Sequence, residues 1–209
     1  MNNILMICCS SSILFGVVKV KIASENRDKQ PWIITMGHRP MYCSDFDDDD
    51  CTKYDSRVRT GLPGTHAYAL EKLFYTYGVD LELWAHEHSY ERMWPLYNRT
   101  VYNGTDSPYI DPPAPVHVVT GSAVYFNCLK SKGCQENTDP FVEHPPPWSA
   151  FRSSNYGFSR MQIFNSTHLY FEQVSASKVR KKSCILSNQR GFLVISSLIP
   201  TYLEIYFDS

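Results

Sequence analysis

Hydrophobic and polar positions alternate in recognisable patterns only after the first 29 residues. Apolar runs at residues 31–36 (PWIITM), 79–84 (VDLELW) and 116–120 (VHVVT) predict three short buried strands. The first of these runs leads directly into the Gly-His pair at 37–38.

A helix is predicted between the first two strands. Four apolar residues repeat at the i, i+3, i+4, i+7 spacing of one helix face: Leu70, Leu73, Phe74 and Tyr77. Thr65 is the candidate N-cap, and Gly78 is placed to end the helix. Residues 156–164 and 168–174 predict a β-hairpin joined at 165–167. This order of strand, helix and further strands indicates an α/β fold.

The two ends of the chain do not share these patterns. Residues 4–18 are apolar, but basic residues follow the run instead of preceding it, so a poor signal peptide and a buried strand pair both remain open. The run is too short for a clear membrane span. The tail after residue 177 is a basic run followed by an apolar stretch. We therefore expect a domain over residues 30–177, with unmatched segments at 1–29 and 178–209.

Composition narrows the classes of function. The 209 residues carry a formal net charge of −1, which offers no electrostatic basis for binding nucleic acid. Seven cysteines leave at least one unpaired or paired between chains, and Cys43 and Cys51 flank an acidic loop as either a local disulfide or two free thiols. Three glycosylation sequons, at Asn98, Asn103 and Asn165, favour a secreted protein or one of the secretory pathway.

Three histidines stand at the ends of predicted strands and are the candidate metal ligands. His38 follows the first strand, and His86 and His88 follow the second. Ligands of open α/β sheets gather at the carboxyl ends of strands, and residues two apart on an extended segment point to one side. Imidazole suits zinc and iron. The alternative for each histidine is a surface residue or a hydrogen-bonded core residue.

Three motifs resemble the carboxyl-terminal half of the catalytic domain of purple acid phosphatases. They are GHRPMYCS at 37–44, WAHEHSYER at 84–92 and VHVVTGSA at 116–123. The iron/zinc enzymes of the animal, plant-like branch are the most similar group, although Ala85 stands where that family usually has glycine. The similarity runs from about residue 31 to about residue 177.

The resemblance implies a partial four-layer α/β/β/α metallophosphoesterase sandwich and acid hydrolysis of phosphate monoesters at a dinuclear centre of Fe and Zn (or Mn). It places His38 and His86 on the divalent metal and His88 on the ferric ion. Arg39 is a possible contact for the phosphate, and no other catalytic residue is assigned.

Other polar residues are expected to have different roles. Four adjacent carboxylates at 47–50 repel one another, so we expect a solvated loop. Glu87 is expected in a supporting position behind the ligands or in solvent, and Arg92 in a structural ion pair. The remaining four histidines are expected to be surface or core residues: His66, His117, His144 and His168.

A complete family member also has an Asp ligand, a bridging Asp with a nearby Tyr, and an Asn in a G-N-H-E string. The 209 residues contain neither G-D-x-x-Y nor G-N-H-E. We therefore expect a truncated form that is weakly active or inactive alone. The alternatives are an inactive secreted glycoprotein with a binding role, or a metallophosphodiesterase.

Overall fold

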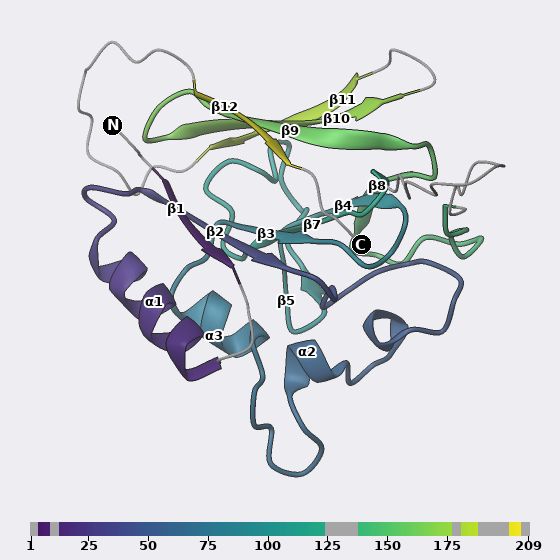
Figure 1. Cartoon of the computed structure of the whole chain (residues 1–209), viewed down its shortest axis with the longest axis horizontal. Coiled ribbons are helices and arrows are strands. Elements are labelled where there is room, and N and C mark those ends of the chain that lie inside the picture. Colours follow the sequence, from purple (N-terminus) through teal and green to yellow (C-terminus); the bar gives the residue numbers. More distant parts are fainter. Residues whose placement is uncertain (1–3, 9–12, 124–137, 177–180, 188–200, 206–209) are drawn as a thin grey trace, which may run out of the picture.

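Three layers make up the structure, a computed structural model that describes residues 4–8, 13–123, 138–176, 181–187 and 201–205. A six-stranded sheet lies in the middle, a four-stranded antiparallel sheet covers one face, and helices cover the other (Figure 1). The described residues thus supply an α/β/β arrangement, which agrees with the predicted α/β class and with three layers of the expected sandwich.

The central sheet has the strand order β1-β2-β3-β7-β4-β8. Its members are β1 (Ile4–Cys8), β2 (Trp32–Gly37), β3 (Leu81–Trp84), β7 (Val116–Thr120), β4 (Tyr90–Met93) and β8 (Ser149–Ser153). The first four are parallel, and β4 and β8 add in antiparallel fashion. The three predicted strands are therefore confirmed as the neighbours β2, β3 and β7.

Alternation along the parallel strands divides the core into two clusters. In β2, Ile33 faces the helices, whereas Trp32 and Ile34 face the second sheet. In β7, Val119 faces the helices and Val118 faces the second sheet. A strand buried on both faces reads as a largely apolar run, and the polar residues Glu82 and His117 within β3 and β7 are buried as well.

The second sheet has the order β11-β10-β9-β12. Its strands are β9 (Gly157–Ile163), β10 (His168–Ser175), β11 (Lys181–Ser187) and β12 (Thr201–Ile205). The predicted hairpin is the β9–β10 pair, in which Leu169 lies opposite Ile163. The tail beyond residue 177 supplies β11 and β12, so in its described parts it extends this sheet. A small separate hairpin joins β5 (Leu96–Tyr97) to β6 (Thr100–Val101).

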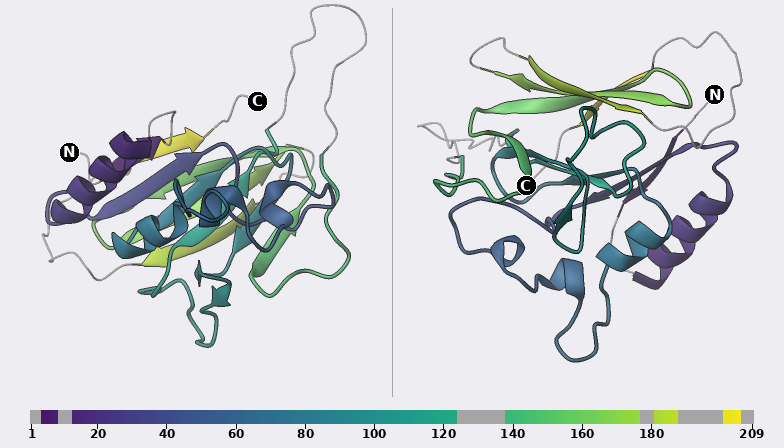
Figure 2. Two further views of the ribbon diagram at one scale, coloured as in Figure 1. Left: turned by 90° about the horizontal axis from the view of Figure 1, so that it is seen from below. Right: turned by 180° about the vertical axis from the view of Figure 1, so that it is seen from behind.

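Among the described residues, three α-helices lie on the side of the central sheet opposite the second sheet (Figures 1 and 2). They are α1 (Ile13–Glu25), α2 (Arg57–Thr60) and α3 (Glu71–Thr76), with a 3-10 turn η1 (Asp50–Thr52) beside them. The segment 1–29, expected to be unmatched, contributes β1 and α1 to the main body. In the described parts of the chain, no helix combines the length and apolar content needed to cross a bilayer.

Helix α3 begins five residues later than the pattern predicted, and its N-cap is Leu70 instead of Thr65. His66 (φ 52°) and Tyr68 (φ 73°) have left-handed backbone, which a right-handed helix cannot include. The apolar face of the pattern is still used, because Phe74 is buried against the sheet. Gly78 (φ 66°) ends the helix as predicted.

A buried polar pair beneath the helices makes stability depend on pH. His117 in β7 and Glu82 in β3 are each 1% exposed, with His117 Nδ1 3.3 Å from Glu82 Oε2. Burial lowers the pKa of His117 to about 4, from an ordinary 6.5. Between these two values the unfolded chain binds a proton here that the folded chain does not, so lowering the pH favours unfolding.

We expect His117→Gln to remove this dependence. As the pH falls from about 6.5 to about 4, the wild-type chain should lose about 3 kcal/mol more unfolding free energy than the variant. Burial raises the pKa of Glu82, which acts in the opposite direction, but that carboxyl is present in both proteins. Urea unfolding at a series of pH values measures the difference. Exposed His144→Gln should keep the wild-type slope, and parallel slopes for wild type and His117→Gln would contradict the prediction.

Candidate metal centre

The carboxyl ends of two neighbouring parallel strands bring the first two candidate histidines together. Gly37, the last residue of β2, lies opposite Trp84, the last residue of β3. A Cβ atom on Gly37 would stand 2.3 Å from Cζ3 of the Trp84 ring, so only glycine fits there. The motif glycine thus allows the two strands to end side by side, one residue before His38 and two residues before His86.

His38 and His86 approach each other edge to face. His38 Nε2 lies 3.0 Å from His86 Nδ1, and the ring planes meet at 73°. Burial lowers the pKa of His38, and the nearby His86, Arg39 and His88 side chains lower it further. The neutral form of His38 is therefore favoured, and a neutral imidazole is the form that binds metal ions.

The segment that carries His86 and His88 is not an extended strand, contrary to the prediction. Strand β3 ends at Trp84, and the chain bends from residue 86 to residue 89 before β4 begins. His86 has a left-handed backbone (φ 66°), so side-chain alternation cannot explain where the two rings point. His88 is anchored separately, because its backbone N–H donates to Asp139 Oδ2 over 2.6 Å.

Asp49 lies beside His86, although the sequence favoured a solvated acidic loop. Its neighbours Asp47 and Asp48 are exposed as expected, but the side chain of Asp49 is only 24% exposed. Asp49 Oδ2 lies 2.8 Å from His86 Nε2, and Arg39 NH1 donates to both carboxylate oxygens at 2.9 and 3.0 Å. Arg39, the possible phosphate contact, is thus held next to the histidines by an ion pair.

The pKa of Asp49 reflects these contacts. Burial by itself would raise this pKa, but the backbone N–H of Asp50 and the Arg39 guanidinium outweigh burial, and the pKa lies below its ordinary value. Asp49 is accordingly an ionised acceptor. A single sequence offers little to separate it from the other three aspartates of the run.

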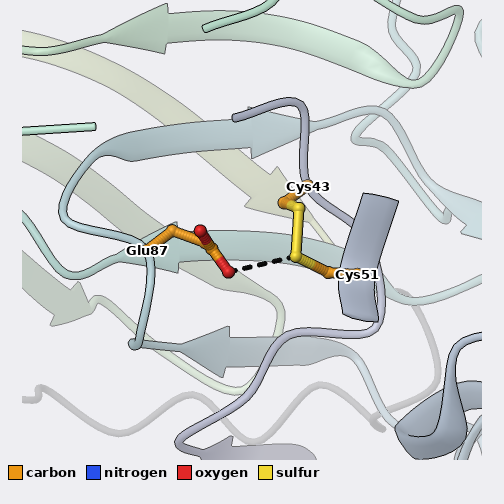
Figure 3. Close-up of side chains that lie close together, drawn as sticks. All are labelled: Cys43, Cys51 and Glu87. Atoms are coloured by element: carbon orange, nitrogen blue, oxygen red, sulfur yellow. Dashed lines mark hydrogen bonds between the residues drawn. A yellow bond between two sulfur atoms is a disulfide. The ribbon is translucent and has the colours of Figure 1, made fainter. Parts of the chain in front are cut away.

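A disulfide closes the loop that carries Asp49. Cys43 and Cys51 are bonded to each other, with their Cα atoms 5.3 Å apart (Figure 3). Oε1 of Glu87 lies 3.1 Å from Cys51 Sγ, which has no hydrogen in the disulfide form. Burial, together with Asp47 and Asp45, raises the pKa of Glu87 to about 10, so the carboxyl is protonated and donates to the sulfur. Glu87 is fully buried, so it lies in a supporting position and is not exposed to solvent.

Two more carboxyl groups gather next to Glu87. Oxygens of Asp45, Glu87 and Asp139 lie within 4.8 Å of one another. Burial raises the pKa of Asp45 to about 7, and the charges of Glu91 and Asp139 add to this. Carboxyl groups that are crowded and buried in this way favour their neutral forms.

The donor groups fit a transition-metal ion. A zinc or iron ion binds imidazole nitrogen at about 2.1 Å, so two nitrogens 3.0 Å apart can contact the same ion. Carboxyl oxygens of Asp49 and Glu87 lie within 4.8 Å of a His86 nitrogen. Imidazole nitrogen is a donor that suits Zn and Fe.

The remaining predicted residues lie away from this centre or serve the core. Arg92 lies over the Tyr109 ring, 5.5 Å from its centroid, and donates to the Tyr109 hydroxyl, where an ion pair was expected. The three sequon asparagines are all exposed: Asn98, Asn103 and Asn165.

Comparisons with known proteins agree with the family that the motifs indicate. Residues 11–90 match the profile of the calcineurin-like phosphoesterases. Residues 114–182 match the profile described as iron/zinc purple acid phosphatase-like protein C. The chain is also 58% identical over 160 residues to acid phosphatase type 7 of Danio rerio and 56% identical over 154 residues to that of Homo sapiens. The chain belongs to the purple acid phosphatase family.

This purple acid phosphatase sequence spans about a third of the curated relatives it matches. The alignments cover 75% and 73% of the chain but 34% and 33% of the two relatives. A purple acid phosphatase from yellow lupin seeds superposes with a TM-score of 0.63 at 23% identity, covering 87% of this chain and 29% of that one. That likeness shows the metallophosphoesterase fold. The profile match from residue 11 begins within the segment 1–29 and includes α1.

Proposed function

We propose that this purple acid phosphatase chain supplies the histidine side of a dinuclear centre that hydrolyses phosphate monoesters in acid. The observation that carries the proposal is the convergence of His38 Nε2 and His86 Nδ1, 3.0 Å apart, at the carboxyl ends of two parallel strands. The relation to acid phosphatase type 7 supports the choice of reaction.

Each residue of the centre has a distinct role in the proposal. His38 and His86 hold the divalent ion, which is Zn or Mn, and His88 holds the ferric ion. Two metal ions supply Lewis acidity, an activated nucleophile and neutralisation of the phosphoryl oxygens. Arg39 presents a guanidinium beside the ligands, where it can pair with an oxygen of the phosphate group.

Three imidazoles are not a full ligand set for two cations. Carboxylate bridges hold such ions together against their mutual repulsion, and the family places these ligands in G-D-x-x-Y and G-N-H-E motifs, which are absent from the 209 residues. We therefore propose that the reaction needs both sets of ligands in one protein, and that the 209-residue chain alone has no appreciable activity.

A chimera tests this proposal. The segment of this chain that matches Danio rerio acid phosphatase type 7 replaces its counterpart in that protein, and p-nitrophenyl phosphate hydrolysis is measured at acid pH with Fe and Zn supplied. We expect turnover by the chimera, a loss of at least about 1,000-fold in its His88→Ala variant, and none by the 209-residue chain. His144→Ala, at an exposed histidine, is the matched control.

Two outcomes would contradict the proposal. Turnover by the 209-residue chain that His88→Ala abolishes would show that the chain needs no further ligands. A chimera as active with His88→Ala as without it would remove the histidine from the centre. Hydrolysis of bis-p-nitrophenyl phosphate in preference to the monoester would point to a phosphodiesterase.

We also propose that the protein is a glycoprotein of the secretory pathway. The exposed sequons and the Cys43–Cys51 disulfide support this location. When the chimera is expressed through that pathway, enzymatic removal of N-glycans should lower its mass. Replacing Asn98, Asn103 and Asn165 together by Gln should make this mass loss smaller, by the mass of the glycans that these three residues carry.

A further inference from the structure

Asp49 and His38 contact different nitrogens of the same imidazole ring. Asp49 Oδ2 lies 2.8 Å from His86 Nε2, whereas His38 Nε2 lies 3.0 Å from His86 Nδ1. A neutral imidazole has one N–H and one lone pair. Because a carboxylate only accepts hydrogen bonds, the hydrogen belongs on Nε2, and the lone pair of Nδ1 is directed towards His38.

We propose that Asp49 is a positioning residue that fixes the tautomer and orientation of His86, so that Nδ1 binds the metal ion. Among the described residues, Asp49 is the hydrogen-bond or ion-pair partner of His86 Nε2. The inference rests on the proposed function, since it needs His86 to be a ligand. Partners of this kind hold metal-binding histidines in place and raise their basicity.

The structure also holds Asp49 itself. Arg39 NH1 bridges both of its carboxylate oxygens, at 2.9 and 3.0 Å. The Asp49 carbonyl accepts from the backbone N–H of Thr52 at 3.1 Å and from its hydroxyl at 2.7 Å, and the disulfide closes the surrounding loop. A carboxylate held by its own side-chain and backbone contacts can orient a neighbouring ring, which a freely moving one cannot.

A role for Asp49 as a direct ligand fits the geometry less well. One imidazole cannot present Nδ1 and Nε2 to the same ion, because the two nitrogens point in different directions. Asp49 is on the Nε2 side, and His38 is on the Nδ1 side. The ion shared by the two histidines is therefore on the far side of the ring from Asp49.

Zinc affinity of the 209-residue chain, measured by competition with a chromogenic chelator, is the first test. We expect Asp49→Ala to weaken zinc binding by about 10- to 100-fold and Asp49→Asn, which keeps an acceptor oxygen, to weaken it less. Asp48→Asn removes the same charge from an exposed site in the same loop, and should bind zinc like the wild type. Equal affinity in wild type and Asp49→Ala would overturn the inference.

The tautomer of His86 in the metal-free chain is the second test, because a purely structural role would not change it. Long-range ¹H–¹⁵N correlation spectra should show hydrogen on Nε2 in the wild type and in Asp48→Asn, and a shift towards the Nδ1–H form in Asp49→Ala. An unchanged tautomer in Asp49→Ala would overturn the inference.

The two tests separate failure of the inference from failure of the proposed function. Zinc binding that is insensitive to His86→Ala would refute the metal centre, whatever Asp49 does. Zinc binding that requires His86 but tolerates Asp49→Ala would refute only the positioning role. A cobalt-substituted chain whose visible spectrum changes in band pattern in Asp49→Asn would make Asp49 a direct ligand and overturn the inference.

Discussion

Replacing Gly121 with alanine should destabilise the chain by about 3 kcal/mol, because there is no room for one more carbon atom. A Cβ on Gly121 would stand 2.1 Å from the backbone oxygen of Glu87 and 3.1 Å from its carbonyl carbon. Gly121 also donates its N–H to the carbonyl of Ser89 over 3.1 Å. Relief would require the whole 85–89 loop to move, since backbone atoms, unlike a flexible side chain, cannot turn away.

Urea and thermal unfolding measure this effect. For a chain of this size the expected fall in Tm is about 6–12 °C. Gly104→Ala is the matched control, because nothing lies within 4 Å of its added Cβ, and its unfolding free energy should stay within about 0.5 kcal/mol of wild type. Wild-type stability in Gly121→Ala would show that Gly121 does not lie in close contact with the backbone of Glu87. Because the displaced loop carries His86 and His88, we also expect zinc affinity to fall in any folded fraction.

Arg59→Met should destabilise the chain by about 3–5 kcal/mol, because it leaves Glu71 buried without its cation. Arg59 is 3% exposed, and its NH1 lies 3.1 Å from Glu71 Oε2. The other oxygen of Glu71 accepts from the Tyr42 hydroxyl and, over 2.8 Å, from the backbone N–H of Asn98. These contacts join α2 and α3 to Tyr42 and to the turn between β5 and β6.

A double-mutant cycle separates the charge pair from simple loss of packing. Glu71→Gln in the Arg59→Met background removes the unpaired charge, so the two changes together should cost at least about 2 kcal/mol less than the sum of the single changes. Arg57→Met makes the same substitution at an exposed position of the same helix and should cost less than about 0.5 kcal/mol. Additive effects of the two single changes would mean that Arg59 and Glu71 do not stabilise each other.

The sequence correctly predicted that His38 and His86 lie at the carboxyl ends of neighbouring strands, and the reason is physical. Short apolar runs identify strands that are buried on both faces, and parallel neighbours bring their carboxyl ends together, so His38 and His86 could be placed side by side. The α3 face and the β9–β10 hairpin followed from local periodicity in the same way.

The residues behind the ligands could not be predicted in this way, because their positions depend on contacts distant in sequence. Asp49 reaches His86 across 37 positions through a loop whose path depends on the disulfide and Arg39. Glu87 is buried next to the left-handed bend at His86, which no periodic pattern indicates. The start of the chain was left open for another reason: its apolar run at residues 4–18 has no helical period, so the pattern did not predict helix α1.

The left-handed backbone at His86 has an evolutionary consequence. An L-residue with a side chain adopts this conformation at a cost of about 1–2 kcal/mol, which glycine avoids and asparagine lessens. Selection for stability alone would therefore drive histidine out of this position. Its place in the bend is best understood as a constraint imposed by chemistry, so in descendants that no longer need the imidazole this position should be among the first to drift towards glycine or asparagine.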